Sequence, residues 1–83
     1  MEIEWTPAAK RALVRLPEKV ASAVVEFVYG ALAGNPQRVG KALRFELEGL
    51  RSARRGDFRV IYRIGGKITI LAIEHRADVY RTK

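Results

Sequence analysis

Residues 49–80, GLRSARRGDFRVIYRIGGKITILAIEHRADVY, decide the expected fold, because apolar and polar side chains alternate through much of the stretch. A period of two is typical of a β-strand with one buried face and one open face. Gly56-Asp57 and Gly65-Gly66 interrupt the pattern, and both suit two-residue turns between antiparallel strands. The stretch therefore predicts three antiparallel strands: a weak one in LRSAR, a strong one in FRVIYRI and a returning one in KITILAIE.

A two-residue loop at Gly65-Gly66 fixes which side chains share a face of the sheet. It places Ile64 opposite Lys67 and Phe58 opposite Ile73. The face expected to meet the core then carries Phe58, Val60, Tyr62, Ile64, Leu71 and Ile73. The other face carries Arg59, Ile61, Arg63, Ile68, Ile70 and Ala72. An antiparallel sheet tolerates one wet face, so we expect that second face to be partly aliphatic and partly cationic.

The N-terminal half predicts a short strand and two helices. Residues 2–5, EIEW, alternate as a strand does, and Thr6 with Pro7 favours the start of a helix that continues to Leu16. A second helix is expected from about Glu18 to Ala33, because apolar residues recur at helical spacing at Val20, Val24, Phe27, Val28 and Ala31. Gly34-Asn35-Pro36 ends it. Residues 37–49 lack a firm period, and we expect a loop with a short extended piece near Leu43 to Leu47.

These elements together predict an α+β fold in the order β-α-α-β-β-β. A small, mostly antiparallel sheet with an N-terminal strand would carry a helical hairpin packed on one face, with Leu13 and Leu16 of the first helix against the second. The length of 83 residues suits a single domain over residues 1–83.

Composition excludes several classes of function. The chain has no cysteine and no cluster of acids and histidines at metal-ligand spacing, so neither a metal nor another cofactor is expected. The first residues, MEIEW, are acidic and do not resemble a signal peptide. No apolar run approaches the roughly 20 residues of a membrane span. We therefore expect a cytoplasmic protein without a membrane partner.

The positive charge is concentrated in the C-terminal third. Residues 1–50 hold seven Lys and Arg against six Asp and Glu, whereas residues 51–83 hold nine against three. With a formal net charge of +7 and a pI near 10.4, the chain is expected to bind a polyanion, either a nucleic acid or an acidic protein.

His75, Arg76 and Tyr80 lie within six positions near the end of this basic segment. Cleavage of RNA through its own 2′-hydroxyl needs a base, cations that neutralise the phosphorane, and an acid for the leaving 5′-oxygen. Histidine, arginine and tyrosine supply these roles without a metal. Each residue alone has an ordinary interpretation: a surface histidine, a solvated arginine and a tyrosine at the edge of the core.

Arg59 also has a structural interpretation, as the partner of Glu74 diagonally across two strands. Such an exposed pair is worth under about 1 kcal/mol and would not itself explain the arginine. For Arg63, which is farther from the other cations, we favour a solvated charge.

Several strings resemble the RelE/ParE toxin superfamily, and RelE-type toxins of mycobacteria and other actinobacteria most of all. They are RLPEKV, NPQRVGKALRFELEGL, SARRGDFRVIYRI and HRADVY, which together span nearly the whole chain. The resemblance implies a toxin of a type II toxin–antitoxin system that enters the ribosomal A site and cuts mRNA there. It also implies a cognate antitoxin with an acidic segment that wraps the toxin, and operator DNA bound mainly through the antitoxin.

The resemblance further implies roles for individual residues. Arg59 matches a family arginine assigned to transition-state stabilisation, and Arg76 and Tyr80 match an arginine and tyrosine pair near the C-terminus. Some branches carry lysines where this chain has Leu50 and Ser52, so the general base stays open, with His75 as a candidate for base or acid. The residues expected to contact RNA are Lys41, Arg44, Arg51, Arg54 and Arg55.

Two other functions fit the same fold. One is a ParE-like toxin that inhibits DNA gyrase and has no nuclease activity. The other is a nucleic-acid-binding relative that has lost its toxicity.

Overall fold

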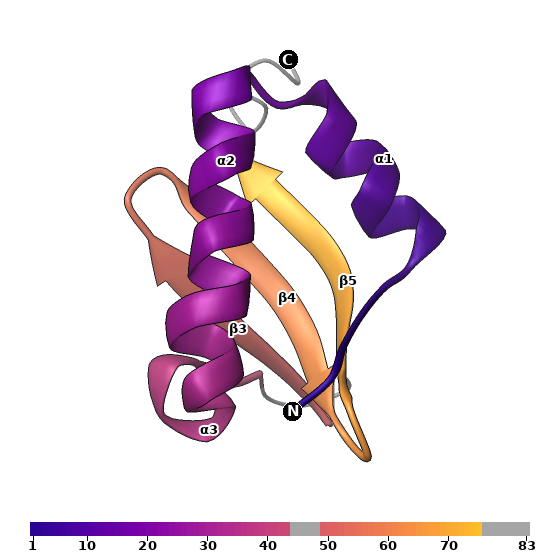
Figure 1. Cartoon of the computed structure of the whole chain (residues 1–83). Coiled ribbons are helices and arrows are strands. Elements are labelled where there is room, and N and C mark those ends of the chain that lie inside the picture. The colour runs from indigo at the N-terminus through magenta and orange to yellow at the C-terminus, as the bar shows by residue number, and fades with distance from the viewer. Residues whose placement is uncertain (44–48, 76–83) are drawn as a thin grey trace.

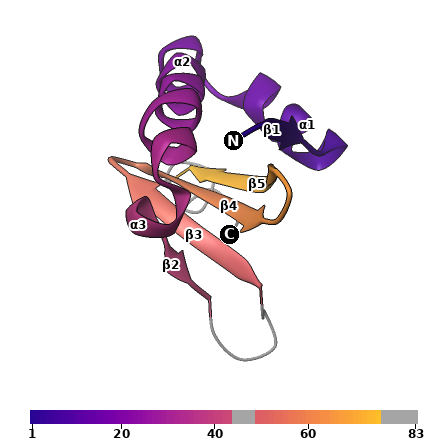
Figure 2. The same cartoon turned by 60° about the horizontal axis from the view of Figure 1, so that its bottom comes forward.

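The computed structural model describes residues 1–43 and 49–75, and five strands in this part of the chain form one sheet in the order β1-β5-β4-β3-β2 (Figures 1 and 2). The elements are β1 (Ile3–Trp5), α1 (Pro7–Arg15), α2 (Glu18–Phe27), the π-helical turn η1 (Val28–Leu32), α3 (Pro36–Val39), β2 (Lys41–Ala42), β3 (Leu50–Arg55), β4 (Phe58–Ile64) and β5 (Ile68–His75). The antiparallel β2-β3-β4-β5 order and the parallel pairing of β1 with β5 confirm the predicted α+β class.

Both long helices lie over the same face of the sheet (Figure 2). Val24 and Phe27 of α2 are buried, and so are Val60 and Tyr62 of β4 beneath them. The ring of Phe27 meets that of Phe58 edge-on, with centroids 6.0 Å apart, a favoured geometry for an aromatic pair. The apolar side of the predicted strands is therefore closed by the helical hairpin, as the sequence indicates.

Thr6 begins α1 and joins it to the sheet. Its Oγ1 accepts a hydrogen bond from the Ala9 N–H at 3.1 Å, which is the expected N-cap, and donates to the Ile70 carbonyl at 3.0 Å. A capping residue of this kind stabilises a helix by about 1 kcal/mol. Here it also fixes the position at which α1 leaves β1 and crosses β5.

The second helix departs from the predicted pattern at its C-terminal end. Residues 28–32 form a π-helical turn, which inserts an extra residue into the helical repeat. As a result Ala31, expected on the buried face, is exposed, and Leu32 is fully buried in its place. The sequence shows the apolar run, but spacing alone does not reveal the change of helical period.

The register of β4 with β5 also differs from the prediction. The connection holds three residues, 65–67, so Ile64 pairs with Ile68 and Tyr62 with Ile70. A bulge opposite Ile61 and Tyr62 then takes up Leu71, and Val60 pairs with Ile73. Ile68 and Ile70, predicted for the outer face, are therefore fully buried in the core, together with Ile73.

Residues 36–42 hold regular structure where a loop was predicted, and the extended piece lies earlier than expected. Pro36–Val39 forms a helical turn and Lys41–Ala42 pairs with β3, whereas the predicted extended segment near Leu43 to Leu47 falls mostly outside the described residues. Arg51 holds this turn, because its Nη2 donates to the Gln37 carbonyl at 2.7 Å and to the Gly40 carbonyl at 3.0 Å.

Tyr62 fixes the same turn from the sheet side. Its side chain is fully buried, and its hydroxyl donates to the Pro36 carbonyl. Gly40 is buried beside it, and a Cβ at this position would lie 2.9 Å from the Ser52 carbonyl oxygen and closer still to the Tyr62 hydroxyl. The φ of Gly40, −118°, suits any residue. Glycine is therefore required here by the lack of space for a side chain and not by the backbone conformation.

The N-terminal strand is fastened at both of its flanks. Glu4 forms an ion pair with Lys67, whose Nζ lies 2.6 Å from the carboxylate of Glu4. The hydrogen bond to Glu4, together with the negative charge of Glu4, raises the pKa of Lys67. Trp5 Nε1 donates to the Tyr29 hydroxyl at 2.9 Å. The contacts connect β1 to the β4–β5 loop and to the end of the second helix.

Gly40→Ala is expected to lower the free energy of unfolding by about 1–3 kcal/mol, because the new methyl group displaces Tyr62 or the β3 backbone. Urea unfolding followed by circular dichroism measures the change. Gly66→Ala is the matched control, since nothing lies within 4 Å of its added Cβ. Equal stability of the two variants would show that Gly40 is not held by this packing.

Arg51→Ala is expected to cost about 1–3 kcal/mol of stability, because the Gln37 and Gly40 carbonyls lose a charged donor. Arg54→Ala, on the exposed side of the same strand, should stay within about 0.5 kcal/mol of the wild type. The same unfolding experiment tests both. An Arg51 variant as stable as the Arg54 variant would contradict a structural role for Arg51.

Candidate functional site

The face of the sheet turned away from α1 and α2 is covered by no helix among the described residues (Figure 2). We call it the open face. Cross-strand partners in an antiparallel sheet project to the same side, so the register assigns its members. They are Lys41, Leu50, Ser52, Arg54, Arg59, Ile61, Arg63, Thr69, Ala72 and Glu74.

A row of three charged residues crosses the open face. Arg54 of β3 pairs with Arg59 of β4, and Arg59 pairs with Glu74 of β5. Arg59 donates from both Nε, at 3.0 Å, and Nη2 to the same carboxylate oxygen, Oε1 of Glu74. The predicted salt bridge is therefore present, directly across the strands rather than diagonal. The side chains of Arg59 and Glu74 are 50% and 45% exposed, so a ligand can reach both.

Two further cations flank this row. Lys41, expected to contact RNA, lies on the open face opposite Ser52. Arg63, which the sequence favoured as a solvated charge, lies there too, opposite Leu50 and Thr69. Ile61 and Ala72, both partly buried, form with Ser52 and Lys41 the next row across the strands, and this row separates Arg63 from the charged row. The open face is thus cationic around an apolar centre, as the alternation predicts, although Ile68 and Ile70 are absent from it.

The other two arginines of β3 project to the helix side. Arg51 is bonded to the α3 turn, and its Nε is buried without a hydrogen-bond partner among the described residues. Arg55 lies with its guanidinium 4.9 Å from the centre of the Phe27 ring, a cation–π distance. Arg51 and Arg55 were both predicted to contact RNA. In the structure, each instead contacts another part of the same chain.

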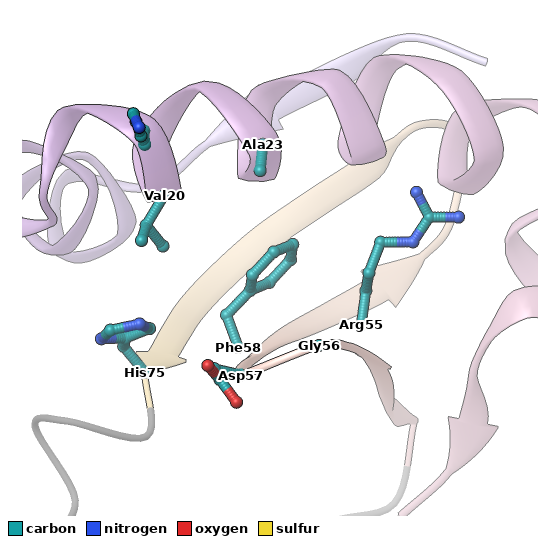
Figure 3. A pocket seen from close by; sticks show the side chains of 8 residues that line it. Val20, Ala23, Arg55, Gly56, Asp57, Phe58 and His75 are labelled. Carbon is teal, nitrogen blue, oxygen red and sulfur yellow. The ribbon is translucent and has the colours of Figure 1, made fainter.

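His75 lines a small pocket between α2 and the β3–β4 turn (Figure 3). It pairs with Phe58, so its imidazole is on the helix side of the sheet. Val20 and Ala23 of α2 form the apolar wall of the pocket, and its polar lining residues are Lys19, Arg55, Asp57 and His75.

The structure therefore does not bring the predicted catalytic residues into one place. Arg59 is on the open face, and His75 is on the opposite side of the sheet. Arg76 and Tyr80, and the predicted RNA contact Arg44, lie outside the described residues. Of the predicted set, Lys41, Arg54 and Arg59 share a face.

Glu74 and Arg63 are the charged open-face residues that the sequence reasoning left without a functional role. The alternation of apolar and polar residues could have placed Glu74 and Arg63 on this face. Residues 59, 61 and 63 share one side of β4, and Glu74 faces Arg59 on that side. Grouping residues by closeness in sequence favoured His75 over its neighbour Glu74.

The open face offers cations for a phosphate, an aliphatic floor for a base or an apolar side chain, and a carboxylate beside an arginine. Arginine suits such a surface because its planar fork binds phosphate in two-point fashion. Within residues 1–43 and 49–75, no group of three or more His, Cys, Asp or Glu is placed to hold a metal ion. No helix in the same part of the chain is both long and apolar enough to cross a bilayer.

Two curated toxins of Mycobacterium tuberculosis are similar to this chain in sequence. Toxin RelE is 54% identical over 79 residues, covering 92% of this chain and 81% of the relative. Toxin RelG is 49% identical over 82 residues, covering 95% and 94%.

Solved structures agree with the sequence relatives. The toxin–antitoxin complex RelBE2 of M. tuberculosis contains a chain with a TM-score of 0.89 and 48% identity, over 93% of this chain and 92% of that one. The archaeal RelE–RelB complex of Pyrococcus horikoshii matches with a TM-score of 0.68 and 26% identity, over 90% and 93%. The isolated RelE toxin of Escherichia coli, at 11% identity and a TM-score of 0.73, shares the fold.

The family model described as the ParE toxin of the type II toxin–antitoxin system parDE matches residues 3–80, nearly the whole chain. The likeness to RelE and RelG places the chain nearer to RelE-type toxins within that superfamily. The chain therefore belongs to the RelE/ParE family of toxins from type II toxin–antitoxin systems.

Proposed function

We propose that this toxin is a ribosome-dependent endoribonuclease that inhibits translation by cutting mRNA in the A site, in the cytoplasm and without a metal. The observation that carries the proposal is the pairing of Arg54 with Arg59 across an uncovered sheet face. Like charges placed directly opposite each other destabilise a sheet, so a fold that needed only solubility would gain nothing from them. Two positive charges side by side, on Arg54 and Arg59, can neutralise the two negative charges of the phosphorane.

Arg59 is suited to the role of charge stabiliser. A guanidinium carries more N–H donors than the two that Glu74 occupies, so Arg59 has donors for a phosphate while the ion pair stays intact. Arg54 provides a second positive charge beside it. Donors placed in advance where charge develops contribute roughly 3–4 kcal/mol of transition-state stabilisation in other enzymes.

The remaining assignments stay predictions. His75 as base or acid, Arg76 as a second stabiliser and Tyr80 as a positioning or stacking group come from the sequence and its resemblance. Lys41 and Arg44 are proposed to contact the mRNA backbone. Arg51 and Arg55 were proposed for the same role, but their contacts with the α3 turn and with Phe27 must be kept or exchanged when RNA binds.

We also propose a cognate antitoxin as the partner of this chain. The RelBE2 and archaeal RelE–RelB structures are complexes of a toxin with its antitoxin. An acidic, amphipathic segment would complement the open face, with its carboxylates against Arg54, Arg59 and Arg63 and its apolar side chains against the aliphatic centre. Operator DNA would be bound only through the complex.

Arg59→Ala is expected to slow single-turnover cleavage of mRNA on programmed ribosomes by about 10²–10³-fold, because a donor to the phosphorane is lost. Arg59→Lys should restore the charge but only part of the rate, since an ammonium lacks the fork. Primer extension gives the rate and the position of the cut. Arg11→Ala, an exposed substitution on α1, is the control. Cleavage by Arg59→Ala at the wild-type rate would contradict the assignment.

The match to a family model described as the ParE toxin of parDE keeps a ParE-like toxin as the second candidate. Its proposed activity is inhibition of DNA gyrase. The two are separated by expressing the toxin without antitoxin. Discrete A-site cuts support the nuclease, whereas DNA double-strand breaks with intact mRNA support gyrase poisoning. Salt-dependent RNA binding without cleavage or DNA damage would indicate an inactive nucleic-acid-binding relative.

Saturating the toxin with its cognate antitoxin should raise the melting temperature of the toxin. A ligand at about 100 times its Kd adds about 2.7 kcal/mol to the folded state. Arg59→Glu should weaken this shift, because it reverses a charge in the cationic row of the open face. An unchanged melting temperature at saturation would count against this partner.

A further inference from the structure

We propose that Glu74 is the general base that accepts the 2′-hydroxyl proton in the cleavage reaction. This inference rests on the proposed endoribonuclease function. It assigns the one role that neither the resemblance nor the composition of the chain settles.

The geometry of the ion pair leaves Glu74 able to act. Both bonds from Arg59 end on Oε1, and no described residue donates a hydrogen bond to Oε2. The side chain is 45% exposed, so a substrate hydroxyl can approach it. Arg59 thus orients the carboxylate through one oxygen and leaves the other for the substrate.

Other acceptors among the described residues suit this role less well. Glu4, opposite Thr69 at the far end of β5, is bonded to Lys67. Ser52 and Thr69 carry hydroxyls, which are poor bases near neutral pH. His75 and Asp57 line the pocket below α2 (Figure 3). The strand pairing puts His75 on the opposite side of the sheet from Arg59. Among residues 1–43 and 49–75, Glu74 is the one that places a carboxylate beside the arginine pair.

The proposed step conserves atoms and charge. Oε2 of Glu74 takes the proton as the 2′-oxygen attacks phosphorus, and the phosphorane is held by Arg59 and Arg54. The bond from phosphorus to the 5′-oxygen then breaks, and that oxygen takes a proton from water or from an acid of the site. The products are a 2′,3′-cyclic phosphate and a 5′-hydroxyl end, and Glu74 returns its proton to solvent.

A base and a charge stabiliser that touch each other match the geometry of this reaction. The 2′-oxygen and the phosphorus it attacks belong to one nucleotide, so the groups that serve them must be neighbours. Arg59 and Glu74, directly opposite on adjacent strands, are such a pair. Strand positions hold them more rigidly than loops would.

The test compares wild type, Glu74→Gln, Glu74→Asp and Glu26→Gln in single-turnover cleavage on programmed ribosomes. Glutamine keeps an oxygen that accepts from Arg59 but cannot take the proton, so we expect a loss of roughly 10²–10⁴-fold. Glu74→Asp should retain more activity than Glu74→Gln. Glu26→Gln makes the same change on the exposed side of α2 and should not alter the rate.

A pH profile separates a base from a residue that merely positions Arg59. The charged described residues that share this part of the open face with Glu74 are Arg59 and Arg54, on β4 and β3, and neither loses its proton in the range assayed. The wild-type rate should fall in acid, and the Glu74→Gln rate should lose that dependence. Melting temperatures verify that the variants fold.

The possible outcomes are distinct. A wild type that cuts mRNA and a folded Glu74→Gln that cuts at the same rate would overturn the assignment and leave the nuclease standing. A Glu74→Gln rate that is slow but keeps the wild-type pH profile would reduce Glu74 to a positioning residue and also overturn it. A wild type that makes no A-site cut would refute the proposed function, and this inference with it.

Discussion

The structure depends on covering one face of the sheet and leaving the other without a helix. In β4 every second side chain is apolar, and Phe58, Val60 and Tyr62 of this set are buried on the helix side, while the residues between them include Arg59 and Arg63. Burial of Val60 and Tyr62 against the helical hairpin holds the strand in this orientation, because a shift of one residue would bring the arginines into the core. The hydrophobic contact on one side thus places the cations on the other.

The sequence was sufficient for β1, the two long helices and the three C-terminal strands, but not for the π-helical turn η1, the turn α3 or the short strand β2. Three features depend on local chemistry and can be predicted without the rest of the fold. They are the N-cap at Thr6, the helix break at Pro17 and the turn at Gly56-Asp57. The register of β4 with β5 was not predictable in this way. Lys67 lies in a loop one residue longer than predicted, where it forms an ion pair with Glu4 of β1. The bulge at Leu71 then compensates for the one-residue shift in strand pairing. Both depend on contacts between segments distant in sequence.

The candidate site shows a different limit. Arg59 and Glu74 were recognised as a pair from sequence, and the structure confirms it, but the pair was interpreted only as stabilising. His75 was grouped with Arg59 because both are chemically suitable and close to other cations. Strand alternation places them on opposite sides whichever of the two registers holds, so this separation was available from the pattern. The contacts of Arg51 and Arg55 within the fold could not be predicted from the pattern, because the α3 turn and the orientation of Phe27 arise only from tertiary packing.

A face with paired arginines is in conflict with the stability of a small protein. An 83-residue chain has a limited core, and Arg54 opposite Arg59 adds repulsion within the sheet. Glu74 offsets part of it, though an exposed pair contributes less than about 1 kcal/mol. A polyanion on the open face would relieve the rest, whether an acidic antitoxin segment or an RNA phosphate. If both ligands bind this face as proposed, the same unbalanced charge would favour the inhibited complex when antitoxin is abundant and substrate binding when it is not, because the two would compete for one set of guanidinium groups.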